Sequence, residues 1–201
     1  MKNYISLYLS RPAVFVLLAA LCWLAVPLRV GAQIKINGWG LRTSVPAWFV
    51  LSPSIGADIS WNQRYRLALD ASYGHGDAPK NDDKGVHLSS VGIEVRRYMK
   101  PVAYSGFYLG ADVRRLEFNY KLSSIGRDGW AITAGILAGY TFKLPASWGI
   151  DVSAGCGYIH SDYTRYRWYE PQKMNRFLNN RIRNTVGLTN LNVALHYGFC
   201  L

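Results

Sequence analysis

The sequence is poor in cysteine, in acidic residues and in long apolar runs. Its 201 residues include 3 Cys, and 12 Asp+Glu stand against 23 Lys+Arg. The one long apolar run, residues 12–26, falls short of the ~20 residues that a membrane-spanning helix needs. A P-loop, a zinc-spaced Cys/His set and a G-x-S-x-G elbow are also missing. We therefore expect no helical membrane anchor, and we assign no catalytic, cofactor-binding or metal-binding residues.

The N-terminus has the order of a secretory signal peptide. Lys2 and Arg11 precede the apolar run, and Val30-Gly31-Ala32 supplies small residues for cleavage. We predict a signal peptide over residues 1–32 and a mature domain over residues 33–201. Cleavage removes three basic residues and no acidic one, so 20 Lys+Arg remain against 12 Asp+Glu, a net charge of +8. Because export argues against nucleic acid as a partner, anionic lipopolysaccharide or polysaccharide is the expected counter-charge.

From residue 37 onward, apolar side chains alternate with small or polar ones. This period of two predicts β-strands with two unlike faces. The alternation slips at Arg114-Arg115, where we predict a β-bulge that restores the register. The eight predicted strands cover residues 37–45, 54–61, 64–73, 86–98, 106–119, 130–144, 148–158 and 191–201.

The last strand organises the prediction of the fold. Every odd position from 191 to 201 is apolar, and a soluble domain rarely ends in this way. Strands with one apolar and one polar face suit an eight-stranded antiparallel up-and-down transmembrane β-barrel of the outer-membrane type. The closing strand is expected to pair with the first strand and to engage the barrel-assembly machinery. This prediction places the mature protein in the Gram-negative outer membrane, in contact with its lipid and lipopolysaccharide.

The connections and the aromatic residues support this topology. Breaks after the second, fourth and sixth strands are short and the others are longer, which predicts tight periplasmic turns, long outer loops and periplasmic termini. A soluble periplasmic β-sandwich or lipocalin-like barrel, with its apolar faces turned inward, is the alternative. Aromatic residues gather at the predicted strand ends, as in a membrane-interface girdle: Trp61, Tyr65, Phe107, Phe142, Trp148 and Phe199 at one side, Tyr73, Trp130 and Tyr158 at the other.

Five strand fragments carry a family resemblance. They are Arg96-Arg97-Tyr98, Gly106-Phe107-Tyr108-Leu109-Gly110, Gly135 with Gly139-Tyr140, Gly155-Cys156-Gly157-Tyr158 and residues 191–199. Together they resemble an outer-membrane family typical of Bacteroidota, the domain-of-unknown-function family 3575. The resemblance implies an outer-membrane barrel and no known reaction.

Charged residues on the predicted inner faces are expected to pair and to plug the lumen. The interior of an eight-stranded barrel is just wide enough for side chains, and buried charges must be paired. A channel or a proton path is the alternative. The predicted inner charges are Asp58, Arg64, Arg66, Asp70, Glu94, Arg96, Asp112, Arg114, Lys143, Asp151 and His196.

One constellation suggests an enzyme. His87 and Ser89 share a predicted lipid-facing side near the outer end of their strand, and Glu117 lies across the predicted hairpin. A Ser, a His and a carboxylate on this face resemble the arrangement in outer-membrane lipid A deacylases. His-x-Ser arises easily by chance, the predicted bulge turns Glu117 inward, and no oxyanion donor can be named. We therefore prefer a protein without enzymatic activity and keep the lipid hydrolase as the alternative.

The last predicted loop, residues 161–186, is basic and rich in aromatic residues. It carries six basic residues against Asp162 and Glu170, a net charge of +4. Its apolar residues have helical spacing, which predicts a short amphipathic helix over the barrel mouth. The loop favours a structural or surface-binding, adhesion-type role, with lipopolysaccharide, an anionic glycan or a surface protein as the partner. The basic residues are Arg165, Arg167, Lys173, Arg176, Arg181 and Arg183, and the helically spaced ones are Met174, Phe177, Leu178 and Ile182.

Overall fold

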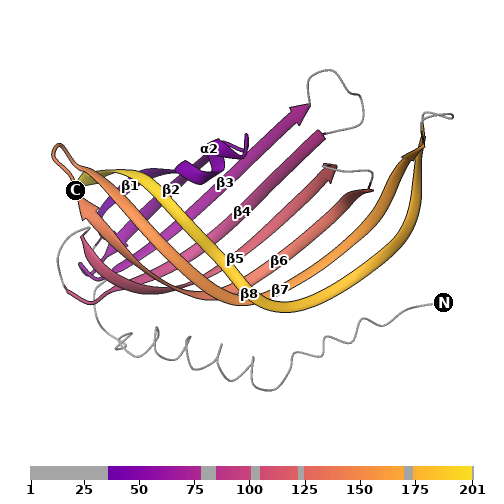
Figure 1. The fold of residues 1–201 in the computed structure, drawn as a ribbon. Helices are drawn as coiled ribbons and strands as arrows, with labels where there is room; N and C mark the ends of the chain where they lie inside the picture. The colour runs from indigo at the N-terminus through magenta and orange to yellow at the C-terminus, as the bar shows by residue number, and fades with distance from the viewer. Residues whose placement is uncertain (1–35, 78–84, 101–104, 122–124, 170–173, 201) are drawn as a thin grey trace. The chain divides into compact units, whose positions relative to one another are not determined.

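Eight antiparallel strands close into an up-and-down barrel, as predicted (Figure 1). The computed structural model describes residues 36–77, 85–100, 105–121, 125–169 and 174–200. The predicted signal peptide, residues 1–32, lies outside the described residues. The strands are β1 (Ile36–Ser44), β2 (Ser54–Trp61), β3 (Tyr65–Asp77), β4 (Gly85–Tyr98), β5 (Gly106–Lys121), β6 (Ile125–Lys143), β7 (Trp148–Tyr169) and β8 (Met174–Cys200), and a short helix α2 (Val45–Phe49) follows β1.

The chain's last strand closes the ring, which confirms the predicted pairing of the first and last strands. β1 pairs with β8 over seven positions, from Gly38 opposite Cys200 to Ser44 opposite Ala194. The rings of Trp39 and Phe199 stack across this seam with centroids 4.1 Å apart. Closure removes the strand edges that an open sheet would leave unpaired.

The barrel has two unlike ends. We call the end that holds residues 62–64, 99–100 and 144–147 the turn end, and the opposite end the far end. The turn between β2 and β3 is tight, as predicted, because Asn62 and Gln63 both adopt the left-handed backbone conformation of a hairpin turn, with φ 50° and 57°.

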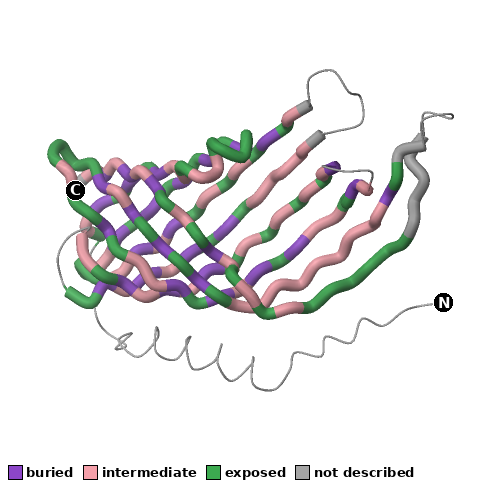
Figure 2. The backbone as a smooth tube through the Cα atoms, viewed as in Figure 1, coloured by how far each residue is buried: buried purple, intermediate pink, exposed green. Residues whose placement is uncertain are grey.

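Apolar side chains cover the outer, convex surface of the barrel, and polar ones fill the inside. Exposed and buried residues therefore alternate along most strands (Figure 2). A lipocalin-like barrel with apolar residues turned inward is contradicted by this arrangement. The exposed apolar side chains that ring the barrel, here called the apolar band, are Trp39, Leu41, Ile55, Ile59, Leu69, Tyr73, Val91, Ile93, Phe107, Val113, Ile132, Ile136, Tyr140, Phe142, Trp148, Val152, Leu191 and Val193.

Two predictions about the far end are wrong. β5 keeps a continuous register with β4 and β6 through Arg114 and Arg115, so no bulge lies there. Residues 161–169 and 174–186, the described part of the predicted loop, form strands and no amphipathic helix, because β7 and β8 pair up to Tyr169 opposite Met174. The longest expected outer loop is therefore strand in its described part, and residues 170–173 separate β7 from β8.

Extension of the strands makes the far end lopsided. β1 ends at Ser44 and β2 begins at Ser54, whereas β5 to β8 continue well beyond the apolar band (Figure 1). We call this part of the sheet the far extension, made of residues 118–121, 125–131, 160–169 and 174–188. β8 departs from regular pairing with β7 at two bulges, which place Thr189 and Leu178 outside the ladder.

Candidate functional site

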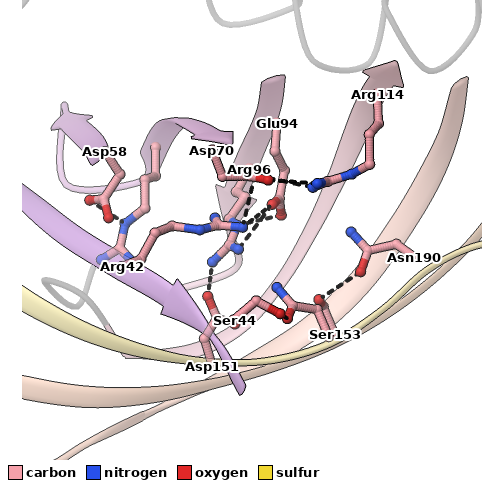
Figure 3. Close-up of polar contacts among 12 residues, drawn as sticks. Arg42, Ser44, Asp58, Asp70, Glu94, Arg96, Arg114, Asp151, Ser153 and Asn190 are labelled. Carbon is pink, nitrogen blue, oxygen red and sulfur yellow. Dashed lines mark hydrogen bonds and ion pairs between the residues drawn. The ribbon is translucent and has the colours of Figure 1, made fainter. Parts of the chain in front are cut away.

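Charged side chains from most strands meet inside the barrel, in the half that lies toward the turn end (Figure 3). Glu94 on β4 lies at the centre of this cluster and is only 1% exposed. It accepts a hydrogen bond of 3.0 Å from Nη2 of Arg42 and one of 2.5 Å from Nε of Arg96. Arg96 also pairs with Asp151, which accepts a hydrogen bond of 2.5 Å from the Tyr108 hydroxyl. These contacts join β1, β4, β5 and β7 across the lumen.

Two further groups extend the network. Asp70 pairs with Nη1 of Arg114 at 2.6 Å and with Nη2 of Arg42 at 3.4 Å. Asp58 lies 3.5 Å from Nε of Arg66 and 3.7 Å from Nε2 of His196. The prediction that inward charges pair and fill the lumen is confirmed for these residues. Their mutual attraction offsets part of the cost of removing each charge from water.

Three corrections apply to the predicted set of inner charges. Arg64 lies exposed in the turn before β3, and Lys143 is exposed at the last position of β6, so neither enters the lumen. The predicted set omits Arg42, although this residue contacts two luminal carboxylates. Its position in the alternation, on the same face as Gly38 and Gly40, is the signal that identifies it as luminal.

Asp112 stands apart from the luminal pairs. It is buried on the inner face of β5, and neither carboxyl oxygen has a hydrogen-bond partner among the described residues. In its described part, the lumen therefore carries five carboxylates, from Asp58, Asp70, Glu94, Asp112 and Asp151, against four guanidinium groups, from Arg42, Arg66, Arg96 and Arg114.

A cavity of about 250 Å³ lies in the lumen on the far-end side of this network. Pro46 and Ala47 of α2 border it on one side, and Leu116 of β5 borders it on another. The hydroxyl groups of Ser72 and Ser90 lie 2.8 Å apart in its wall. Arg42, Asp70 and Arg114 belong both to the charged network and to the lining of this cavity.

Arginine residues gather on the concave face of the far extension. Alternation carries this face upward from the buried luminal residues Thr133 on β6 and Ser153 on β7. In the register of β6, β7 and β8, Arg127 lies opposite Arg165, and Arg181 lies opposite a tyrosine of β7. The set, here called the arginine face, is Arg127, Arg165, Arg167, Arg181 and Arg183.

Aromatic rings interleave with these arginines. The guanidinium carbon of Arg127 lies 5.9 Å from the ring centre of Tyr120 and 5.8 Å from that of Tyr163. Nη1 of Arg127 also donates a hydrogen bond of 2.9 Å to the Tyr120 hydroxyl. Such stacking holds the guanidinium group in place without neutralising its charge.

Acidic residues of this region lie on the opposite, convex face. Asp128 and Asp162 share the outward side with Trp130 and His160, whose rings are 5.4 Å apart. Burial, and then the carboxylate of Asp128, raise the pKa of Tyr166 on this side. Among the described residues of the far extension, the concave face carries no Asp or Glu. The two faces of the same strands therefore differ in charge.

The basic character predicted for residues 161–186 has a different structural basis from the one expected. Arg165, Arg167, Arg181 and Arg183 are brought together by strand pairing. Arg127, from a strand outside the predicted loop, joins them. Alternation in β6 and β7 contained this signal for Arg127, Arg165 and Arg167, which share the inward phase of Thr133 and Ser153. Arg181 and Arg183 lie on the outward phase of the closing strand, and the bulge at Thr189 turns them inward.

The structure also places the candidate Ser, His and carboxylate. Ser89 lies directly opposite Glu117 in the ladder, and His87 is two residues away on the same convex face. Because β5 has no bulge, Glu117 faces outward rather than inward. It forms an ion pair with Arg115, at 2.8 Å. Among the described residues no hydrogen bond links His87 to Ser89, and the His87 ring packs edge-on against Tyr73.

Comparison with known proteins decides the family. Residues 16–199 match the family model described as protein of unknown function (DUF3575). The chain belongs to this family. No curated protein matches this DUF3575 chain.

Within the described residues, no helix is long and apolar enough to cross a membrane, a finding that has no bearing on crossing by strands. The same residues hold no group of three or more His, Cys, Asp or Glu side chains placed to bind a metal ion.

Proposed function

We propose that this DUF3575 protein is an outer-membrane barrel whose far extension projects from the cell surface and binds anionic polymers. The observation that carries the proposal is the arginine face, where five guanidinium groups share one concave surface without a described acidic residue. Guanidinium groups form strong bidentate contacts with phosphate and carboxylate groups. Lipopolysaccharide phosphates and acidic surface glycans offer these groups in repeating arrays.

The apolar band supports the membrane location. On β6 its convex residues run from Ile132 to Phe142, and a transmembrane strand needs about 9–11 residues. Stacked rings of Trp61 and Tyr65, 5.7 Å apart, lie at the turn end, where an aromatic belt meets the membrane interface. In this orientation the turn end and both mature termini face the periplasm, and the closing strand engages the assembly machinery.

Fractionation tests the location. The mature protein is expected in the outer membrane, and it should migrate faster on a gel when unheated than when boiled, since a closed barrel resists detergent. Recovery of the folded protein in the soluble periplasm would contradict the proposal.

A matched pair of variants tests the binding surface. Replacing Arg165, Arg181 and Arg183 by Ser should weaken binding to lipopolysaccharide and to polygalacturonate, with little effect on neutral dextran. Salt should weaken the same binding in the parent protein, because exposed charges are screened. The control replaces Arg64, Arg97 and Lys143, at the turn end, by Ser and removes the same charge. Equal losses in both variants would show that net charge, and not the arginine face, governs binding.

A second candidate function is a lipid-face hydrolase. The register favours it, because Ser89 and Glu117 are direct cross-strand neighbours and His87 shares their convex face. Catalysis needs the His ring to reach the Ser hydroxyl, and hydrogen bonds of this kind often tighten only when substrate binds. The Arg115 pair of Glu117 competes with that arrangement.

Mass spectrometry of lipid A separates the two candidates. If the hydrolase proposal holds, expression removes one acyl chain and Ser89→Ala restores it, while Ser90→Ala, on the luminal face next to it, leaves the removal intact. Unaltered lipid A in the presence of the folded protein would exclude this activity and leave the binding proposal standing.

A further inference from the structure

The far extension leaves one side of β8 without a neighbouring strand. β1 reaches only to Ser44, opposite Ala194, and beyond that point β8 pairs with β7 alone within the described part of the chain. Figure 1 shows β7 and β8 running together past the end of β1. α2 lies beside the lower part of this edge, since Pro46 and Ala47 line the same cavity as residues 189–192. The open edge therefore begins beyond Thr189, on the side toward the far end.

Ten residues of this edge form a regular segment. The bulges at Leu178 and Thr189 bound residues 179–188, which pair with β7 without interruption. Eight of the ten are exposed and the other two are partly exposed, and Figure 2 shows this stretch of β8 mostly in the exposed colour. None of them is proline. Every second residue of such a strand directs its backbone N–H and C=O away from its partner, ready to bond with an added strand.

Charge identifies the kind of strand that fits. Arg181 and Arg183 lie on the concave side of the segment, next to the other members of the arginine face. A second copy of β8 would bring arginines against arginines, and like charges facing each other destabilise a strand pair. On the convex side, Ile182, Val186 and Leu188 are 64%, 77% and 61% exposed. A strand with acidic residues on one face and apolar residues on the other matches both sides.

We propose that residues 179–188 of β8 bind an extended acidic polypeptide segment by strand addition. The backbone edge supplies the hydrogen bonds, and Arg181 and Arg183 select carboxylates along one face of the added strand. This goes beyond binding of anionic polymers on the arginine face, because it requires backbone pairing in a fixed register.

The test uses the whole barrel in lipid nanodiscs and a ten-residue peptide of alternating Glu and Val as the probe. Binding should protect alternate amides of residues 179–188 from hydrogen exchange. N-methylation of the peptide at one alternate set of amides should abolish binding, and methylation of the other set should leave it. A Lys-Val peptide should not bind. Arg181→Ser with Arg183→Ser should weaken binding about tenfold or more, since charge-assisted contacts are lost, whereas Arg64→Ser with Lys143→Ser should not.

Two results would overturn the proposal. Equal binding of both N-methylated peptides would mean that carboxylates attach to the arginine face without strand pairing, which leaves the proposed polymer binding intact. Dimerisation of the barrel through residues 179–188, with no binding of the Glu-Val peptide, would identify a second copy as the occupant instead.

Discussion

The apolar band and the far extension are parts of the same strands with opposite side-chain patterns. In β5, Phe107 and Val113 face outward in the apolar band, whereas Arg115 and Glu117 face outward nearer the far end. The ladder has no break between them. The inner face changes as well, from Asp112 in the barrel to aromatic residues beyond it. The period of two is thus a property of the strand, and the proposed membrane location accounts for the apolar outer phase in the apolar band.

Arginine shows the same contrast. Arg96 in the lumen is only 1% exposed and pairs with Glu94 and Asp151. Arg127 in the far extension is exposed, and its contacts with the described residues are to tyrosine groups. The luminal residue is therefore expected to serve stability, and the exposed one to serve binding. The predictions below test this division, in order of decreasing effect.

The largest effect is expected from shortening the closing strand. Removing residues 197–201 deletes four of the seven β1–β8 pairs, among them Trp39 opposite Phe199. The barrel should then fail to assemble, because both seam strands become unpaired edges. The control replaces residues 163–181 of the far extension by an Asn-Gly turn. It removes a longer piece of chain than the C-terminal truncation but leaves the β1–β8 pairs in place, so a heat-modifiable barrel should still form. Assembly of the C-terminal truncation would contradict the role of the seam.

The second comparison replaces one arginine in each region. Arg96→Met leaves Asp151 buried without a guanidinium partner and Glu94 with Arg42 alone, which should cost about 3–5 kcal/mol of unfolding free energy. Arg127→Met removes an exposed hydrogen bond and ring contacts, which should cost about 1 kcal/mol or less. Urea titration of the barrel in lipid vesicles measures both values. Similar costs would contradict the division between a structural and a binding arginine.

The third comparison places lysine on the convex face. Ile136→Lys lies in the apolar band and should cost ~2–4 kcal/mol if that face meets the bilayer midplane. Ile182→Lys, on the same face of the far extension, should change stability by about 0.5 kcal/mol or less. Ala194→Lys serves as the luminal control, because Ala194 is only 1% exposed and its replacement is limited by packing. Tolerance of Ile136→Lys together with intolerance of Ala194→Lys would favour a barrel surrounded by water.

Much of the barrel could be predicted from the sequence, because apolar residues on the outward face of each strand make the period of two visible. The β6 segment with Ile132, Ile136 and Phe142, and the closing strand, are recognisable for this reason. Their facing and the seam with β1 are confirmed. Pairing of luminal charges follows from the narrow interior of an eight-stranded barrel. Which carboxylate meets which arginine does not follow, since that depends on stagger between strands.

The far extension could not be predicted in the same way. At Arg114-Arg115 the outward face changes from apolar to charged without a break in the ladder, and in the sequence this change of pattern resembles a bulge. Between residues 159 and 188 both faces carry polar and aromatic residues, so the strand signal is weak and composition resembles a loop. The edge at residues 179–188 depends on where β1 ends relative to β8, which only the register reveals.

Depth profiling along β5 tests the central claim most directly. In a background with Cys156→Ser and Cys200→Ser, single cysteines at Leu109, Val113, Glu117 and Asn119 carry a fluorophore on the convex face of the barrel in lipid vesicles. Brominated acyl chains should quench the labels at 109 and 113, and a water-soluble quencher should reach those at 117 and 119. Water access at all four sites would contradict the claim that the change of phase at Arg115 marks the membrane surface.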